Sequence, residues 1–123
     1  MPSDAQRART SNASGHLDIA TRAAGEQATV SLAGELDVSA AAEVASSLEG
    51  LAGETKAIVL DIDSVSFIDS AGLRCILVCQ DMCREAGVEL TLTPGSPRVR
   101  RVFEVTGLID RLPAPGPGAA DED

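Results

Sequence analysis

The segment AIVLDIDSVSFIDSAGLRCILVCQDMCREAG, residues 57–87, contains a predicted strand followed by a predicted helix. Its first seven residues are almost continuously apolar and rich in β-branched side chains, which is typical of a central strand covered on both faces. Residues 64–68 make the connection. Asp69 and Ser70 are cap candidates for a helix that runs to about Ala86, and Gly87 ends it.

Upstream of this segment the sequence predicts two strands and a helix. Residues 16–22 and 27–32 both alternate between apolar and polar side chains, and the turn around Gly25 indicates a hairpin. Asp37 and Ser39 are N-cap candidates for the helix that follows. That helix covers residues 40–51, is rich in Ala, Leu and Glu, and ends at Gly53.

Downstream, residues 88–93 form another predicted strand. Ser96 is then an N-cap, Pro97 is the first residue of a short helix, and Gly107 ends that helix. This order of strands and helices predicts an α/β fold built on a small mixed sheet.

Composition limits the function of the chain. The 123 residues carry 10 Lys and Arg against 19 Asp and Glu, a net charge of −9, with no Trp, no Tyr and two Phe. Such a chain repels phosphate backbones and has few aromatic side chains for stacking on bases, so no nucleic-acid partner is expected. Its apolar runs are too short to span a bilayer, so we expect a cytoplasmic protein.

The two ends differ from the middle of the chain. Residues 1–14 are polar, and residues 113–123 are acidic and rich in Pro, Gly and Ala, so both are expected to be disordered tails. Residues 15–112 are the predicted folded domain, and we expect it to be a monomer or a weak dimer.

At 3.6 residues per turn, the sequence after Asp69 predicts a helix with one face in the core and one face in solvent. Arg74 lies on the predicted solvent face, and Ser70, Leu73 and Leu77 fall on or beside it. An exposed leucine close to a capping serine is either ordinary surface or the anchor of a partner interface. The predicted core face consists of Ala71, Cys75, Val78, Cys79, Met82, Cys83 and Ala86.

Three cysteines, Cys75, Cys79 and Cys83, recur every four residues on that core face. A metal site is one interpretation. No histidine is nearby, however, and a buried free cysteine behaves as a small hydrophobe, so packing is favoured and neither a metal nor another cofactor is expected. The single histidine, His16, is interpreted as a turn or surface residue.

Enzymatic readings of Ser70 are weak. Ile68 occupies the place of the leading glycine of a nucleophile elbow, and neither a Walker A nor a dinucleotide-binding motif occurs. A receiver-type phosphoaspartate at Asp61 or Asp69 lacks a late lysine. The local pattern therefore leaves two readings of Ser70 open: a helix cap, or a phosphorylated residue at a helix N-terminus.

Three strings carry a family resemblance: GELD at residues 34–37, VSFIDSAGL at 65–73 and VFEVTGL at 102–108. In order and spacing they strongly resemble the STAS domain of bacterial anti-sigma factor antagonists, and the resemblance covers residues 15–112. It implies about four to five strands with about four helices packed mainly on one side, and no catalytic activity.

The resemblance also implies a regulatory cycle. An anti-sigma factor that is also a serine kinase would phosphorylate Ser70. The unphosphorylated chain would bind that factor and release its sigma factor, and a serine phosphatase would restore the binding form. The alternative is a STAS scaffold subunit of a signalling or lipid-transport complex whose serine is never modified.

The expected partner-binding surface surrounds Ser70. Two positions depart from the family pattern: Ala71 stands where many members have a second serine, and Arg74 stands where a small glycine is common. Arg74, one turn from Ser70, is a candidate to pair with a phosphate or with an acidic partner. The expected partner-binding residues are Glu35, Leu36, Asp37, Asp69, Ser70, Leu73, Arg74 and Leu77.

Overall fold

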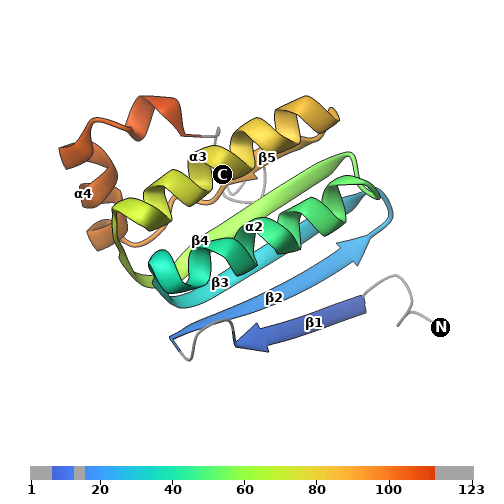
Figure 1. Ribbon diagram of the computed structural model, residues 1–123, viewed down its shortest axis with the longest axis horizontal. Helices are drawn as coiled ribbons and strands as arrows, with labels where there is room; N and C mark the ends of the chain where they lie inside the picture. Colours follow the sequence, from blue (N-terminus) through green and yellow to red (C-terminus); the bar gives the residue numbers. More distant parts are fainter. Residues whose placement is uncertain (1–6, 13–15, 113–123) are drawn as a thin grey trace, which may run out of the picture.

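The computed structural model describes residues 7–12 and 16–112, which form one mixed five-stranded sheet with helices packed against it (Figure 1). Along the sheet the strands follow their order in the sequence. The β1, β2 and β3 strands are antiparallel neighbours, whereas β3, β4 and β5 run parallel. The strands are β1 (Arg7–Asn12), β2 (Leu17–Ala24), β3 (Gln27–Leu36), β4 (Ala57–Ile68) and β5 (Glu89–Leu92).

The helices connect the parallel strands and close the domain. The α2 helix (Val38–Ala52) links β3 to β4, and α3 (Ser70–Ala86) links β4 to β5. Parallel neighbours require such crossovers, because a short turn cannot bring the chain back to the starting edge. The α4 helix (Pro97–Thr106) and the short 3-10 helix η1 (Ile109–Arg111) complete the chain.

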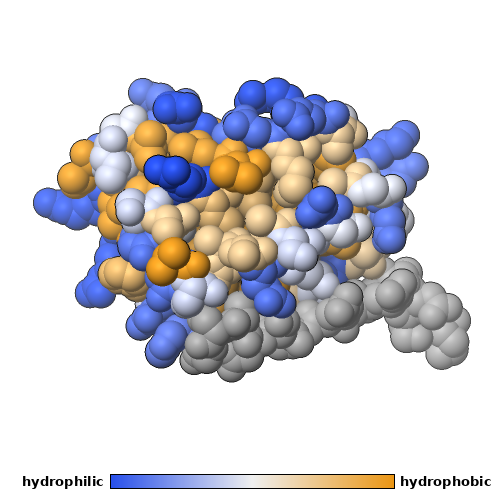
Figure 2. Space-filling view, in the orientation of Figure 1, coloured by the Kyte–Doolittle hydropathy of each residue, from blue (hydrophilic) through white to orange (hydrophobic). Residues whose placement is uncertain are grey.

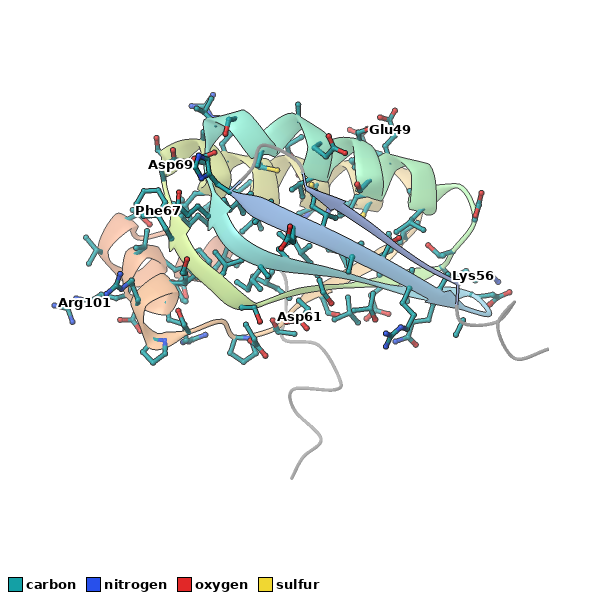
Figure 3. The ribbon with its side chains drawn as sticks, turned by 90° about the horizontal axis from the view of Figure 1, so that it is seen from below. Glu49, Lys56, Asp61, Phe67, Asp69 and Arg101 are labelled. Carbon is teal, nitrogen blue, oxygen red and sulfur yellow. The ribbon has the colours of Figure 1, made fainter. Side chains whose placement is uncertain are left out.

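Alternating side chains of the strands build the core. In the first parts of β3 and β4 every second residue is buried, for example Val30 and Leu60, which are completely buried. The helices contribute positions at helical spacing, such as Val44 and Leu48 of α2 and Phe103 of α4. Figure 3 shows α2 and α3 side by side on one face of the sheet.

The predicted helix ends are confirmed, because local caps determine them. Asp37 is the N-cap of α2 and Ser96 that of α4, with the Ser96 hydroxyl accepting a hydrogen bond from the Val99 N–H. Gly87 and Gly107 end α3 and α4 in the left-handed conformation that a glycine adopts without steric cost.

Three sequence-based expectations about the strands need correction. Residues 7–12, expected to be part of a disordered tail, form β1, because pairing with β2 uses backbone groups and needs no apolar side chains. The β4 strand continues through residues 64–68, which were expected to be a connection. It is also covered by helices on one face only, and alternate residues such as Val59 and Asp61 on the other face are only partly buried.

The remaining expectations for the tails, on residues 1–6, 13–14 and 113–123, lie outside the described residues. Among the residues that the structure does describe, no helix combines the length and the apolar character needed to cross a membrane.

Candidate functional site

Ser70 is the first residue of α3 and is not its cap. The N-cap is Asp69, whose Oδ1 accepts a hydrogen bond from the Gly72 N–H at 2.9 Å. The Ser70 side chain is exposed, and within the described part of the chain its hydroxyl has no hydrogen-bond partner. Because Asp69 satisfies the helix end, the Ser70 hydroxyl is left without a structural role.

The end of β3 holds the tip of α3 in place. Leu36 pairs with Ile68 in the sheet, and the Leu36 carbonyl oxygen accepts a hydrogen bond from the Asp69 N–H at 3.3 Å. Gly72 packs against the same carbonyl so closely that a Cβ at this position would collide with it. The glycine of the motif at 65–73 is therefore explained by a close backbone approach.

Glu35 and Asp37 lie at the same edge of the sheet, as expected. Glu35 is exposed and pairs in register with Phe67, whose side chain is 46% exposed. Figure 3 shows Phe67 and Asp69 together at this end of the molecule.

Asp37 caps α2. Its Oδ1 accepts hydrogen bonds from the Ser39 hydroxyl at 2.6 Å and from the Ser39 N–H at 3.0 Å. These bonds, above all the one from the hydroxyl, hold the pKa of Asp37 below its ordinary value. Asp37 is thus an anion at neutral pH, close to the tip of α3.

Arg74 is the cation of this site. It lies four residues after Ser70 on α3, and side chains at this spacing are neighbours on a helix surface. Its side chain is exposed, and it forms no ion pair with any residue that the structure describes. The guanidinium is therefore available to an anionic group.

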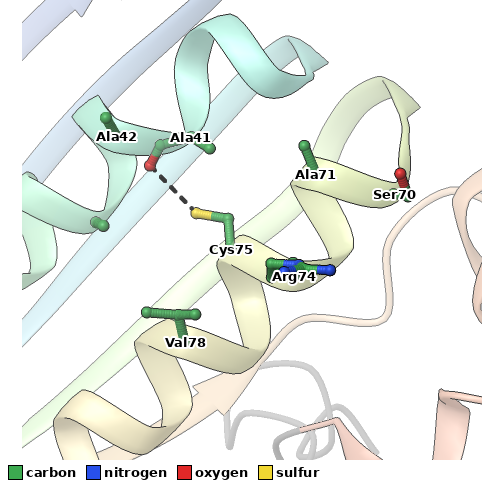
Figure 4. A pocket seen from close by; sticks show the side chains of 8 residues that line it. Ala41, Ala42, Ser70, Ala71, Arg74, Cys75 and Val78 are labelled. Carbon is green, nitrogen blue, oxygen red and sulfur yellow. Dashed lines mark hydrogen bonds between the residues drawn. The ribbon is translucent and has the colours of Figure 1, made fainter.

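An apolar groove of about 390 Å³ separates the first halves of α2 and α3 (Figure 4). Its floor is made of small side chains, so the two helices leave space between them. Figure 2 shows the corresponding pale-orange region on the face of the molecule that carries α2 and α3. The lining residues are Ala41, Ala42, Ala45, Ser70, Ala71, Arg74, Cys75 and Val78.

Two of the expected partner-binding leucines are not available to a partner. Leu36 is 0% exposed and Leu73 only 4%, so both belong to the core, and Leu77 is half-buried. Val78, expected on the core face, is 49% exposed and lines the groove instead. The reason is that α3 packs against both the sheet and α2. The side of the helix that is buried therefore differs from the side predicted for a helix that packs against one surface.

The groove itself was missed at the sequence level. The signal for it was the small residues Ala41, Ala42 and Ala45 in the first half of α2, which line the groove together with Ala71 of α3. Alanine side chains are small, so they leave part of the surface between two helices unfilled. Which alanines face one another depends on the crossing angle of the helices, and the crossing angle cannot be predicted from a sequence pattern.

The three cysteines are free and buried, which agrees with the packing interpretation. Among the described residues, no group of three or more His, Cys, Asp or Glu side chains could hold a metal ion. His16 is exposed, and its backbone carbonyl accepts a hydrogen bond from the Glu35 N–H at 2.8 Å. It is a turn and surface residue, as expected.

Comparison with known proteins gives the site a context. The family model described as "STAS domain" matches residues 18–116. The anti-sigma-B factor antagonist of Bacillus subtilis is 35% identical over 81 residues, 66% of this chain and 74% of the relative. The anti-sigma-B factor antagonist of Staphylococcus aureus is 31% identical over 98 residues, 79% of this chain and 91% of the relative. A shorter match, 39% identical over 56 residues, spans about half of a relative from Bordetella bronchiseptica, 48% of its length.

Solved structures share the fold. The anti-sigma factor antagonist SpoIIAA in its unphosphorylated form superposes with a TM-score of 0.63 at 24% identity, covering 78% of this chain and 85% of that one. SpoIIAA of Bacillus in its phosphorylated form superposes with a TM-score of 0.58, also at 24% identity, covering 80% and 90%. At this identity the likeness shows the architecture alone.

Proposed function

The chain belongs to the STAS domain family, and on that premise we propose that it is an anti-sigma factor antagonist controlled by phosphorylation of Ser70. In this proposal the unphosphorylated chain binds an anti-sigma factor that is also a serine kinase, and the sigma factor is released. A serine phosphatase reverses the modification, and the chain itself needs no catalytic chemistry. Because sigma factors act in transcription, we expect this role in the cytoplasm.

The observation that carries the proposal is the position of the Ser70 hydroxyl. It is exposed, it has no hydrogen-bond partner among the described residues, and it lies at the edge of an apolar groove. A kinase can therefore reach this oxygen in the free protein. A partner that covers the groove would also cover the oxygen, so a phosphate on Ser70 would lie inside the interface and oppose stable binding.

The unphosphorylated surface combines apolar and charged groups. Val78 and the alanines of the groove offer area from which a partner can exclude water, which favours association. Arg74 lies beside them without an ion-pair partner in the described chain, and we infer that it pairs with an acidic residue of the anti-sigma factor. Glu35 and Asp37 extend the surface onto β3 and α2.

A phosphate on Ser70 would change this surface in two ways. It adds about −1.5 to −2 charges next to Asp69, and it is placed to pair with Arg74, which is then lost to the partner. On the free protein the first turn of α3 tolerates the anion. In the complex the anion would have to lose its water, and a penalty of about 4 kcal/mol would weaken binding about a thousandfold.

Two variants of Ser70 test the proposal. We expect Ser70→Ala to bind the cognate anti-sigma kinase like the natural chain, and Ser70→Asp to lose about a thousandfold in affinity, measured by calorimetry. Ser46→Asp is the matched control, because Ser46 is an exposed α2 residue outside the groove lining and this variant adds the same charge. Equal binding by Ser70→Ala and Ser70→Asp would refute the proposed switch.

Incubation with the kinase and ATP gives an independent readout. The natural chain should gain the mass of one phosphate, and Ser70→Ala should gain none. Tight binding to the anti-sigma factor without any gain in mass would favour the unmodified scaffold subunit.

A further inference from the structure

The proposed switch does not use the thiols of α3, and one of these differs from the other two. Cys79 and Cys83 are 0% exposed, whereas Cys75 is 5% exposed and lines the groove next to Ala71 and Arg74. The Cys75 Sγ–H donates a hydrogen bond to the Ala41 carbonyl oxygen of α2 at 3.3 Å (Figure 4). Its sulfur therefore lies in the lining of the groove between α2 and α3, where a molecule bound in the groove would contact it.

Cys75 and Cys79 act as a pair, because they are one turn apart on the same helix. A hydrogen bond from the Cys79 side chain lowers the pKa of Cys75, and the same bond raises the pKa of Cys79. Of the two thiols, Cys75 is therefore the easier to ionise. Since the thiolate is the nucleophile in thiol chemistry, Cys75 is the reactive member.

The residues around Cys75 determine which thiol-reactive molecules can reach it and bind beside it. A volume of about 390 Å³ lies within the range of small-molecule sites, about 300 to 1,000 Å³. Arg74 lies in the lining without an ion-pair partner in the described chain, so it favours a reagent that carries a carboxylate. Apart from the Ser70 hydroxyl, the other lining side chains are apolar or weakly polar and carry no competing charge.

We propose that Cys75 is a modification site for small, carboxylate-bearing disulfides, and that the resulting adduct fills the groove and blocks the partner. The thiolate of Cys75 attacks one sulfur of the reagent, a new S–S bond forms, and the S–S bond of the reagent breaks. The other half of the reagent leaves as its thiolate, and the proton that Cys75 released passes to water or buffer. The blocking half of this inference rests on the proposed function; the modification itself does not.

The test uses the folded chain of 123 residues and the carboxylate-bearing disulfide 5,5′-dithiobis(2-nitrobenzoic acid). We expect one thiol to react at least tenfold faster than the other two, with release of one equivalent of coloured thiolate per chain. In Cys75→Ser and in Cys75→Ala the fast phase should disappear, whereas in Cys83→Ala it should persist. Three thiols that react together at the rate of unfolding would overturn the inference.

The role of Arg74 has a matched control on the same helix. Arg84 is also exposed on α3, but it pairs with Asp81 at 3.5 Å and lies outside the groove lining. Arg74→Gln should slow the fast phase about fivefold, because one nearby charge is lost, whereas Arg84→Gln should not change it. With the uncharged reagent 4,4′-dithiodipyridine neither variant should differ from the natural chain. Equal slowing by both arginine variants would overturn the selection of carboxylates.

The consequence for binding is measured on protein modified with oxidised glutathione. The adduct on Cys75 should weaken binding to the anti-sigma kinase at least tenfold, and a thiol reductant should restore it. Full binding by the adduct would overturn the blocking half of the inference. Failure of the proposed function is recognised separately, because Ser70→Ala and Ser70→Asp would then bind equally while Cys75 still reacts.

Discussion

At the scale of single residues, Asp69 and Ser70 are neighbours in the sequence but have different roles at the start of α3. Asp69 satisfies the end of α3 through its bond to the Gly72 N–H, and Ser70 is left exposed without a bond in the described chain. In a serine that capped the helix itself, the hydroxyl would already be engaged with a backbone N–H group. If Ser70 is phosphorylated as proposed, this separation lets the surface change while the cap at Asp69 stays in place.

This division predicts unequal costs of substitution. Asp69→Ala should lower the free energy of unfolding by about 1 kcal/mol, because a helix cap is lost. Ser70→Ala should change it by less than about 0.5 kcal/mol, the usual range for an exposed side chain. Urea unfolding followed by circular dichroism measures both. A larger loss for Ser70→Ala than for Asp69→Ala would show that Ser70 is the cap.

Asp37 should make stability depend on pH in the acid range. Its bonds to Ser39 lower its pKa in the folded chain, so the unfolded chain binds the proton more tightly. The contribution is therefore fully present above the ordinary aspartate pKa of about 3.9, and it is lost as the pH falls through the lower folded-state value.

Carboxyl chemical shifts in NMR measure this titration. In Ser39→Ala the pKa of Asp37 should rise toward its ordinary value, because the hydroxyl is the main cause of the shift. An unchanged titration of Asp37 in Ser39→Ala would contradict this assignment.

At the scale of elements, the contact between the end of β3 and the first turn of α3 builds the site. The Leu36 carbonyl meets the Asp69 N–H and leaves no room for a side chain at Gly72. This contact holds the tip of α3 beside the start of α2, so the groove between the two helices stays open. Glycine is required here by close packing, since its φ angle is not positive.

Two glycine-to-alanine changes should have opposite effects. Gly72→Ala forces α3 away from β3 and should cost about 1–3 kcal/mol of unfolding free energy, as overpacking does. Gly50 lies in α2 with nothing near its Cβ position, so Gly50→Ala should gain about 0.5–1 kcal/mol through helix propensity.

Thermal unfolding separates these two outcomes, and binding to the proposed anti-sigma partner provides a second readout. Gly72→Ala should also weaken binding because it moves the tip of α3, whereas Gly50→Ala should leave binding unchanged. A neutral or stabilising Gly72→Ala would contradict the close approach to Leu36.

At the scale of the whole molecule, α2 and α3 lie on one face of the sheet, and the site lies where β3 and β4 end (Figure 3). The β1 strand lies far from them in strand order, at the outer edge next to β2. It covers hydrogen-bonding groups of β2 that would otherwise face solvent. An uncovered edge is a template for pairing with another chain.

Removal of residues 1–14 should therefore promote self-association through β2. The core face of β2 is retained, so the shortened chain should still fold and still bind the proposed anti-sigma partner. Sedimentation analysis should give it a larger mean mass than the full chain at equal concentration. An unchanged mass would show that β1 has no protective role.

Local sequence determined most of the element boundaries. Asp37, Asp69, Ser96, Gly87 and Gly107 act on backbone groups within a few residues of themselves, so their effect can be predicted without knowing the rest of the molecule. The alternating strands and the motif at 65–73 likewise indicated the α/β fold and the place of Ser70.

Only the tertiary structure decided which side chains a partner can touch. Leu73 is buried and Val78 is exposed because α3 packs against two surfaces, the sheet and α2. The helical periodicity of the sequence predicts only one buried face. The groove and the place of Cys75 in its wall depend on how closely two helices approach, which is determined by packing between residues more than thirty positions apart, such as Ala41 and Cys75.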